Sequence, residues 1–263
     1  MATIPCSHRP LAALALLALL AAAPALADWC DEDGWGDGRS FCEVRETTLP
    51  AGGTIRVDAA PNGGVHGRGF DGGEVRVEAR VSAHARSEER AREIVSEIRI
   101  ETDGTIRAEG PRVHGREGWS VSFRLEVPRD SDLVFETTNG GVGVEGVRGD
   151  IDMRTTNGGI RLVDAGGDVR GRTTNGGISV TLTGSTWEGE GLDLRTTNGG
   201  VTIEVPEGYA ADLEVGTVNG GMKFDFPVTL EGDVRRRMEL ELGGGGPPVR
   251  VTTTNGGFRL RRP

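Results

Sequence analysis

The segment Thr173-Thr174-Asn175-Gly176-Gly177-Ile178-Ser179-Val180 carries the pattern that decides the fold. Its Asn-Gly-Gly core recurs along the 263-residue chain, and in most copies two threonines precede it. A motif that returns at a period of roughly 20 residues indicates a repeat architecture. The recurrence also accounts for a good part of the glycine content, which is 43 residues. The seven copies begin at Asn62, Asn139, Asn157, Asn175, Asn198, Asn219 and Asn255.

Apolar and polar side chains alternate on both sides of the motif. The third and fifth residues after the asparagine are apolar, as in Ile178 and Val180, and the residue between them is small or polar. The sixth and fourth residues before the asparagine are mostly apolar, and the second residue before it is threonine in every copy from Asn139 onward. Alternation with a period of two is typical of a half-buried strand. Each copy therefore predicts a strand, a corner at Asn-Gly-Gly and a second strand.

Two all-β architectures contain such a unit. Asn-Gly is a strong hairpin signal, so an antiparallel meander fits the pattern. A β-solenoid is favoured because a nearly constant period stacks identical corners on one another, asparagine on asparagine and threonine on threonine. The corner glycines are then expected to supply a positive φ and a close approach of neighbouring backbones. The interval between Asn219 and Asn255 is 36 residues, twice the commonest spacing of 18, which predicts a degenerate coil between them.

The first residues have the features of a secretory signal peptide. Arg9 precedes an apolar run of leucine and alanine, and Ala25-Leu26-Ala27 fits a cleavage site. We expect residues 1–27 to be removed on export to the periplasm or the extracellular space. No later apolar run has the length of a membrane-crossing helix, so we expect no transmembrane segment in the mature chain.

Cys30 and Cys42 remain after this removal. Because the compartment is oxidising, we expect one disulfide between them, which closes an acidic segment at residues 28–42. The run Asp31-Glu32-Asp33-Gly34-Trp35-Gly36-Asp37 lacks the ligand spacing of an EF-hand, so a solvated loop is favoured over a calcium site. No metal site and no cofactor are expected.

Residues 43–263 are expected to form one β-solenoid domain with coils of about 18–23 residues. N-terminal coils and a helix occupy residues 43–127, and the Asn-Gly-Gly coils occupy residues 128–263. The one predicted helix, residues 88–98, follows the N-cap candidate Ser87. We expect it to pack on a solenoid face or to cap one end. Its apolar side chains share one face: Ala91, Ile94, Val95 and Ile98.

The chain resembles a bacterial family of repetitive β-solenoid proteins that are described as adhesins and have no assigned function. The resemblance rests on the exported start, the helix start Ser87-Glu88-Glu89-Arg90-Ala91, the strand end Val127-Pro128 and the repeated Thr-Thr-Asn-Gly-Gly coils. It covers most of residues 43–263. It implies a right-handed β-helix-like solenoid in the cell envelope, and it supplies no catalytic residues.

Charged side chains between the inward-facing positions form the candidate binding face. Asp152 and Asp193 are expected two coils apart, with Arg170 between them. Such alternation favours a solvated lattice of ion pairs. A carboxylate pair for glycoside hydrolysis and an arginine-lined surface for an anionic glycan are the two alternatives. The candidate face comprises Asp152, Arg154, Arg170, Arg172, Asp193 and Arg195.

The formal net charge of −10 at pH 7 argues against nucleic acid and anionic membranes as bulk partners. The sequence contains many structure-setting residues and no catalytic motif. We therefore expect an exported, non-enzymatic, adhesin-like solenoid that binds an envelope or surface partner, either a protein or a polysaccharide, through its charged faces. A polysaccharide-active β-helix enzyme and a purely structural envelope protein are the alternatives.

Overall fold

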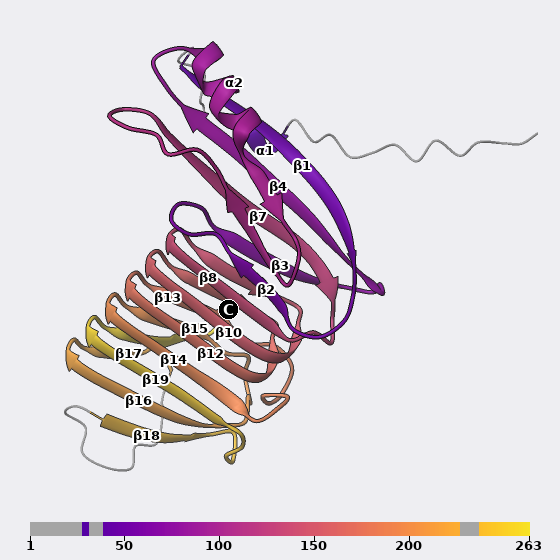
Figure 1. The fold of residues 1–263 in the computed structure, drawn as a ribbon. Coiled ribbons are helices and arrows are strands. Elements are labelled where there is room, and N and C mark those ends of the chain that lie inside the picture. The colour runs from indigo at the N-terminus through magenta and orange to yellow at the C-terminus, as the bar shows by residue number, and fades with distance from the viewer. Residues whose placement is uncertain (1–27, 32–38, 227–236) are drawn as a thin grey trace, which may run out of the picture.

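A computed structural model describes residues 28–31, 39–226 and 237–263. The predicted signal peptide, most of the predicted acidic loop and part of the segment between Asn219 and Asn255 lie outside the described residues. The described chain is mostly strand and forms two sheets whose apolar sides enclose one continuous core. Figure 1 shows the coils stacked along one axis, with longer strands at the N-terminal end of the stack.

Each sheet has ten strands in the described part of the chain, and we call them sheet A and sheet B. In spatial order, sheet A consists of β1 (Ser40–Pro50), β4 (Glu74–His84), β7 (Gly118–Pro128), β3 (Val65–Phe70), β9 (Val142–Glu145), β11 (Ile160–Val163), β13 (Ile178–Thr181), β15 (Val201–Glu204), β20 (Phe258–Arg261) and β17 (Met222–Phe224). Sheet B consists of β18 (Arg237–Leu242), β16 (Ala211–Asn219), β19 (Pro248–Asn255), β14 (Gly191–Asn198), β12 (Gly166–Asn175), β10 (Arg148–Asn157), β8 (Leu133–Asn139), β2 (Ile55–Asp58), β6 (Thr105–Glu109) and β5 (Arg99–Glu101).

The coils are parallel and in register. β10 pairs in parallel with β8 and β12, and Asn157 stands opposite both Asn139 and Asn175. β11 pairs in parallel with β9 and β13 in the same way. The predicted solenoid is therefore confirmed and the antiparallel meander is wrong for these coils. The predicted inward positions are buried, as shown by Ile151 and Met153 of β10.

The Asn-Gly-Gly corners are held by two ladders of hydrogen bonds. All seven asparagines form one ladder, in which Asn157 Nδ2 donates to Asn139 Oδ1 at 2.8 Å and Asn175 Nδ2 donates to Asn157 Oδ1 at 2.8 Å. The buried threonine of each coil donates to a neighbouring coil, as Thr155 Oγ1 does to the Gly140 carbonyl at 2.8 Å. The threonine ladder pairs hydroxyl groups that would otherwise lie unsatisfied at the edge of the core, whereas the asparagine ladder lies at the exposed surface of the corners.

From Gly140 onward, the first glycine of each corner is required by close approach alone. A Cβ at Gly158 would lie 1.9 Å from the Gly140 carbonyl oxygen, which no side chain can do. The expected positive φ is wrong for the corners from Gly140 onward, all of which are described. Positive φ occurs on the other side of the coil, as at Gly167 near the start of β12, with φ of 103°.

The order of the coils in space departs from their order in the chain. β19 and β20, which end the chain, lie between the coil of β14 and β15 and the coil of β16 and β17. The segment Arg237–Leu242 forms β18, which pairs antiparallel with β16 at the edge of sheet B. The prediction of a degenerate coil between Asn219 and Asn255 is therefore wrong for the described part of this interval, which forms an antiparallel edge strand before β19 enters the stack.

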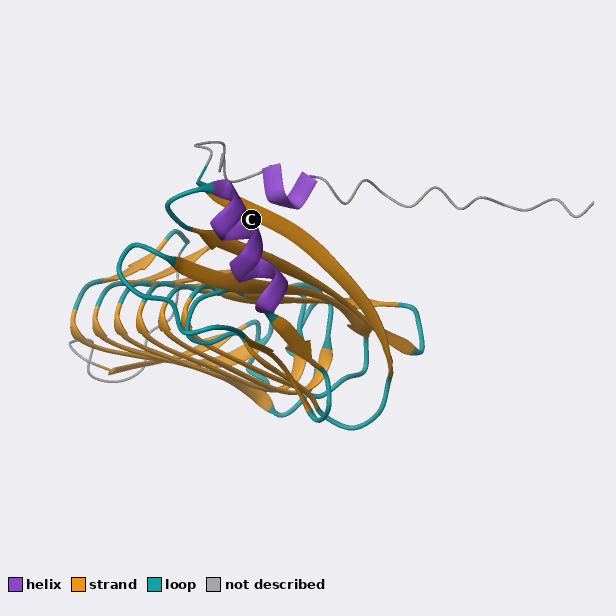
Figure 2. Ribbon diagram, turned by 45° about the horizontal axis from the view of Figure 1, so that its top comes forward, coloured by secondary structure: helices purple, strands orange, loops and turns teal. Residues whose placement is uncertain are grey.

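The N-terminal third combines one coil with long antiparallel strands. β2 and β3 pair in parallel with β8 and β9, as a coil does. β1 pairs antiparallel with β4, and β4 with β7, so these strands extend sheet A without forming a coil. The predicted helix is present as α2 (Glu88–Glu97), and Ser87 caps it by accepting a hydrogen bond from the Arg90 backbone N–H. α2 packs on β1 and β4 and buries its apolar face against the core (Figure 2). It covers the part of sheet A that sheet B does not reach.

Candidate functional site

The six residues of the predicted binding face lie together on the outer side of sheet B. They belong to β10, β12 and β14, and register places Arg170 directly between Asp152 and Asp193. Asp193 accepts two hydrogen bonds from Arg195, at 3.1 and 2.8 Å. Asp152 accepts one from Arg154 at 2.5 Å, and Arg154 also binds Glu136 at 3.1 Å. Neighbouring guanidinium groups therefore bind both carboxylates, and Asp152 Oδ1 is buried without a hydrogen-bond partner in the described part of the chain.

A groove of about 770 Å³ lies instead on the outer side of sheet A. It runs from α1 (Asp28–Asp31) and β7 across β3, β9, β11, β13 and β15 to β20. None of the described residues that line it is acidic. We call it the arginine groove after its basic lining, which consists of Arg80, Arg124, Arg161, Arg259 and Arg261, with His66 beside them.

One register row forms the length of the groove. The row has one residue from each strand and is built from the positions between the two inward-facing columns. His66 of β3 stands between Arg124 and Gly143, and a Cβ at Gly143 would lie 2.5 Å from His66 Nδ1. Gly143 thus leaves the space that the imidazole ring occupies. In spatial order the row reads Arg124, His66, Gly143, Arg161, Ser179, Thr202 and Arg259, followed by Lys223 of β17.

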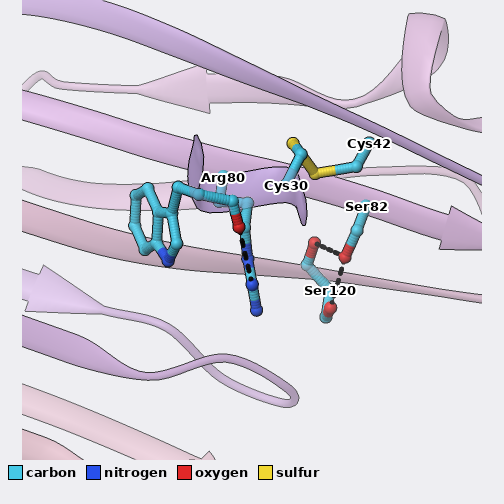
Figure 3. Close-up of a disulfide and its surroundings, with 6 residues drawn as sticks. Cys30, Cys42, Arg80, Ser82 and Ser120 are labelled. Atoms are coloured by element: carbon cyan, nitrogen blue, oxygen red, sulfur yellow. Dashed lines mark hydrogen bonds between the residues drawn. A yellow bond between two sulfur atoms is a disulfide. The ribbon is translucent and has the colours of Figure 1, made fainter. Parts of the chain in front are cut away.

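Trp29 closes the N-terminal end of the groove. The disulfide between Cys30 and Cys42 ties α1 to β1, as Figure 3 shows beside Arg80. The ring of Trp29 is buried, and the guanidinium carbons of Arg124 and Arg80 lie 3.9 and 5.4 Å from its centroid. Cation–π contacts of this kind orient a guanidinium group. The predicted disulfide therefore also holds the tryptophan that positions two groove arginines.

The arginines differ in their partners. Arg259 Nη2 binds Asp225 Oδ2 at 2.8 Å, and Arg261 binds Glu204. These hydrogen bonds hold the pKa values of both carboxyl groups below their usual range. Arg161 is exposed and has no ion pair within the described residues. Its charge is therefore available to a ligand.

His66 is half-buried in this basic surrounding. Burial lowers its pKa; the carboxylate of Glu145 acts in the opposite direction, whereas Arg124, Arg161 and Arg68 lower the pKa further. His66 is therefore neutral at pH 7 and gains charge only under acidic conditions.

The described residues contain neither a cluster of metal ligands nor a helix that could cross a bilayer. Nowhere in residues 28–31, 39–226 and 237–263 do three or more His, Cys, Asp or Glu side chains converge as metal ligands. Within the same ranges, each helix is too short or too polar to cross a bilayer.

The profile of the Toastrack DUF4097 family matches residues 121–261, which is more than half of the chain. The chain belongs to this family. The match begins in β7 and ends in β20, so it includes every coil of the Toastrack stack from β8 onward and both arginines at the far end of the groove. Membership agrees with the resemblance at the level of the family, and the Asn-Gly-Gly corners are features of this chain.

Solved structures similar to this Toastrack chain have low sequence identity. A proposed cell adhesion protein from Clostridium sporogenes has 9% identity and a TM-score of 0.46, over 86% of this chain and 100% of that chain. A proposed adhesin from Bacteroides fragilis has 11% identity and a TM-score of 0.41, over 85% and 97%. A proposed lipid binding protein from Parabacteroides distasonis has 10% identity and a TM-score of 0.35, over 86% and 98%. A search of curated protein sequences found no match.

The groove was missed by reasoning from the sequence. The sequence shows the row as the residue between the two apolar positions that follow each corner. In β9, β11, β13 and β15, however, only one of these residues is an arginine, Arg161. The other basic residues of the groove come from β3, β4, β7 and β20, and β20 lies far from the first three in the chain. Only the strand order brings them into one groove.

Proposed function

We propose that the protein is an exported, non-enzymatic, adhesin-like solenoid that binds an envelope or surface partner through the arginine groove. One observation carries the proposal: a chain with a net charge of −10 has a groove in which no described lining residue is acidic and five are arginines. A local basic surface on an acidic protein attracts a partner of opposite charge to one place. Membership in the Toastrack DUF4097 family is compatible with this role.

The disulfide supports export. Disulfides persist in oxidising compartments, which include the periplasm and the extracellular space. The bond between Cys30 and Cys42 has a structural task, since it fixes Trp29 at the end of the groove. In one of these compartments the disulfide would form, and Trp29 would be held at the end of the groove.

The face of sheet B is the competing surface for a partner. Arg172 of β12 lies on that face, and like Arg161 it has no ion pair within the described residues. The two arginines therefore form a matched pair on opposite sides of the solenoid. Reversing either charge changes the net charge by the same amount.

The test is a binding screen against an array of glycans and against envelope proteins, using wild type, Arg161→Glu and Arg172→Glu. We expect wild type and Arg172→Glu to bind the same partner, and Arg161→Glu to lose it. Loss with Arg172→Glu alone would move the site to sheet B. Wild-type protein that binds nothing in either screen would favour a purely structural role.

A further inference from the structure

The cations of the groove are evenly spaced. Arg124, Arg161 and Arg259 lie on strands β7, β11 and β20, and two strands separate each successive pair. Three strand spacings are about 14 Å, so the three arginines span about 29 Å along the solenoid axis. This spacing depends on the insertion of β20 next to β15. In chain order, β17 would take that place and present Lys223 instead.

The floor between these arginines has low relief. The second glycines of successive corners line one side of the groove, and the row itself contributes the small side chains of Ser179 and Thr202. A Cβ on Gly141 would lie 3.6 Å from the nearest backbone oxygen, which leaves room for a side chain there. Cβ atoms on Gly159, Gly177 and Gly200 would lie 3.2–3.3 Å from backbone oxygens, so close packing favours glycine at these corners. A flat bed with charges at regular intervals fits an extended chain rather than a compact molecule.

We propose that the ligand is a linear acidic polysaccharide. It lies across the strands, parallel to the solenoid axis, and its anionic groups meet Arg124, Arg161 and Arg259 in turn. At Arg259 they meet the guanidinium donors that are not directed at Asp225. Arginine suits carboxylate, sulfate and phosphate groups because its planar fork donates two parallel hydrogen bonds. Hydroxyls of Ser179 and Thr202 face the sugar units between the charged positions. This inference rests on the proposed function and names the class of partner.

A polysaccharide is favoured over two other polyanions. Single-stranded nucleic acid is bound by aromatic side chains on which the bases stack. The one tryptophan of the groove, Trp29, is buried and carries arginines against its ring. A membrane surface is bound by apolar side chains that enter the lipid. Among the described residues the one strongly exposed large apolar side chain is Val218, which does not line the groove.

The test measures the affinity of the full exported chain for fragments of polygalacturonate of increasing length. Methyl-esterified polygalacturonate of equal length is the matched control, because it has the same backbone without the charges. We expect affinity to rise with length until the fragment spans about 29 Å, and then to level off. We expect Arg161→Gln to weaken binding about fivefold, the upper range for one exposed ion pair. Arg172→Gln on sheet B should leave the affinity unchanged.

The outcomes separate this inference from the proposed function. Equal binding of charged and esterified fragments through the groove would overturn the acidic ligand and leave the groove as the binding site. Tighter binding of a thymidine oligonucleotide or of phosphatidylglycerol vesicles would replace the polysaccharide by nucleic acid or by a membrane. Binding that Arg172→Gln weakens and Arg161→Gln does not would overturn both proposals. Affinity that is independent of fragment length would overturn the extended binding mode.

Discussion

Asn255 Nδ2 donates a hydrogen bond to Asn198 Oδ1 at 2.8 Å across 57 residues of sequence, and Asn255 Oδ1 accepts one from Asn219 at 2.9 Å. The last corner of the chain thus lies between two earlier corners. The same insertion places Arg250 between Asp193 and Glu214 on the outer side of sheet B. Without β19 in this position, the two acidic residues would be direct neighbours.

Arg250→Glu is expected to destabilise the fold relative to Arg250→Gln by about 1 kcal/mol, since it places three like charges on adjacent strands. The reason is the observed order Asp193, Arg250, Glu214, in which Arg250 Nε lies 3.4 Å from Glu214 Oε2. Urea unfolding of both variants measures the difference. Equal midpoints for the two variants would mean that charge alternation does not stabilise the inserted coil.

Much of this fold follows from local pattern, and the insertion does not. The alternation around Asn175 predicts which side chains are buried, and the repeated corner predicts parallel coils in register. Chain order carries no information on which coil comes last in space. The charges of Asp193, Arg250 and Glu214 do indicate the spatial order, because acidic and basic side chains alternate only when Arg250 lies between the two acidic residues. The groove could not be predicted for the same reason, since its row joins Arg124 to Arg259 through the strand order.

The first and second glycines of a corner are expected to respond differently to alanine. A Cβ at Gly140 would lie 2.1 Å from the Gly63 carbonyl oxygen, whereas one at Gly141 would lie 3.6 Å from the Gly159 oxygen. Gly140→Ala should therefore cost about 1–3 kcal/mol, as overpacking does. Gly141→Ala should change stability by less than about 0.5 kcal/mol. Thermal unfolding of the two variants measures both, and similar losses would disprove the close-approach explanation.

The asparagine ladder is expected to stabilise the corners inside the stack more than the corner of Asn219 at its end. Asn175 donates to Asn157 and accepts from Asn198, whereas Asn219 makes one ladder bond, to Asn255. At about 1 kcal/mol for each hydrogen bond, Asn175→Ala should cost about 2 kcal/mol and Asn219→Ala about 1 kcal/mol. Denaturant unfolding at several protein concentrations measures the free energies. A larger loss at Asn219 would contradict a ladder of equivalent bonds.

The disulfide is expected to control the end of the groove rather than the coils. Cys30→Ser combined with Cys42→Ser removes the covalent tie between α1 and β1, so Trp29 should leave its contacts with Arg80 and Arg124. We expect a red shift of tryptophan emission and weaker binding of polygalacturonate, with the circular dichroism of the sheets retained. Trp29→Phe in both backgrounds assigns the shift to this residue. A shift that persists in the Trp29→Phe pair would show that another tryptophan reports the change.

Because of His66, we expect the stability of the fold to decrease and the affinity for a polyanion to increase as the pH is lowered. Its pKa in the folded chain is lowered by burial, with Glu145 of β9 acting against this and Arg124 of β7, Arg161 of β11 and Arg68 of its own strand reinforcing it. The unfolded chain therefore takes up a proton first as pH falls below about 6.5, and stability decreases from there down to the folded pKa. A polyanion in the groove favours protonated His66, so its affinity should increase over the same range.

Dextran sulfate is the ligand for this measurement, because its sulfate groups stay ionised between pH 5 and pH 7. We expect wild-type affinity to rise as the pH is lowered across this range, by at most about tenfold per pH unit for one proton. His66→Gln should bind with an affinity that varies less with pH, and its stability should also fall less on acidification. Affinity that rises equally in both proteins would assign the linked proton to another group. A wild-type affinity that falls with pH would show that the ligand does not approach His66.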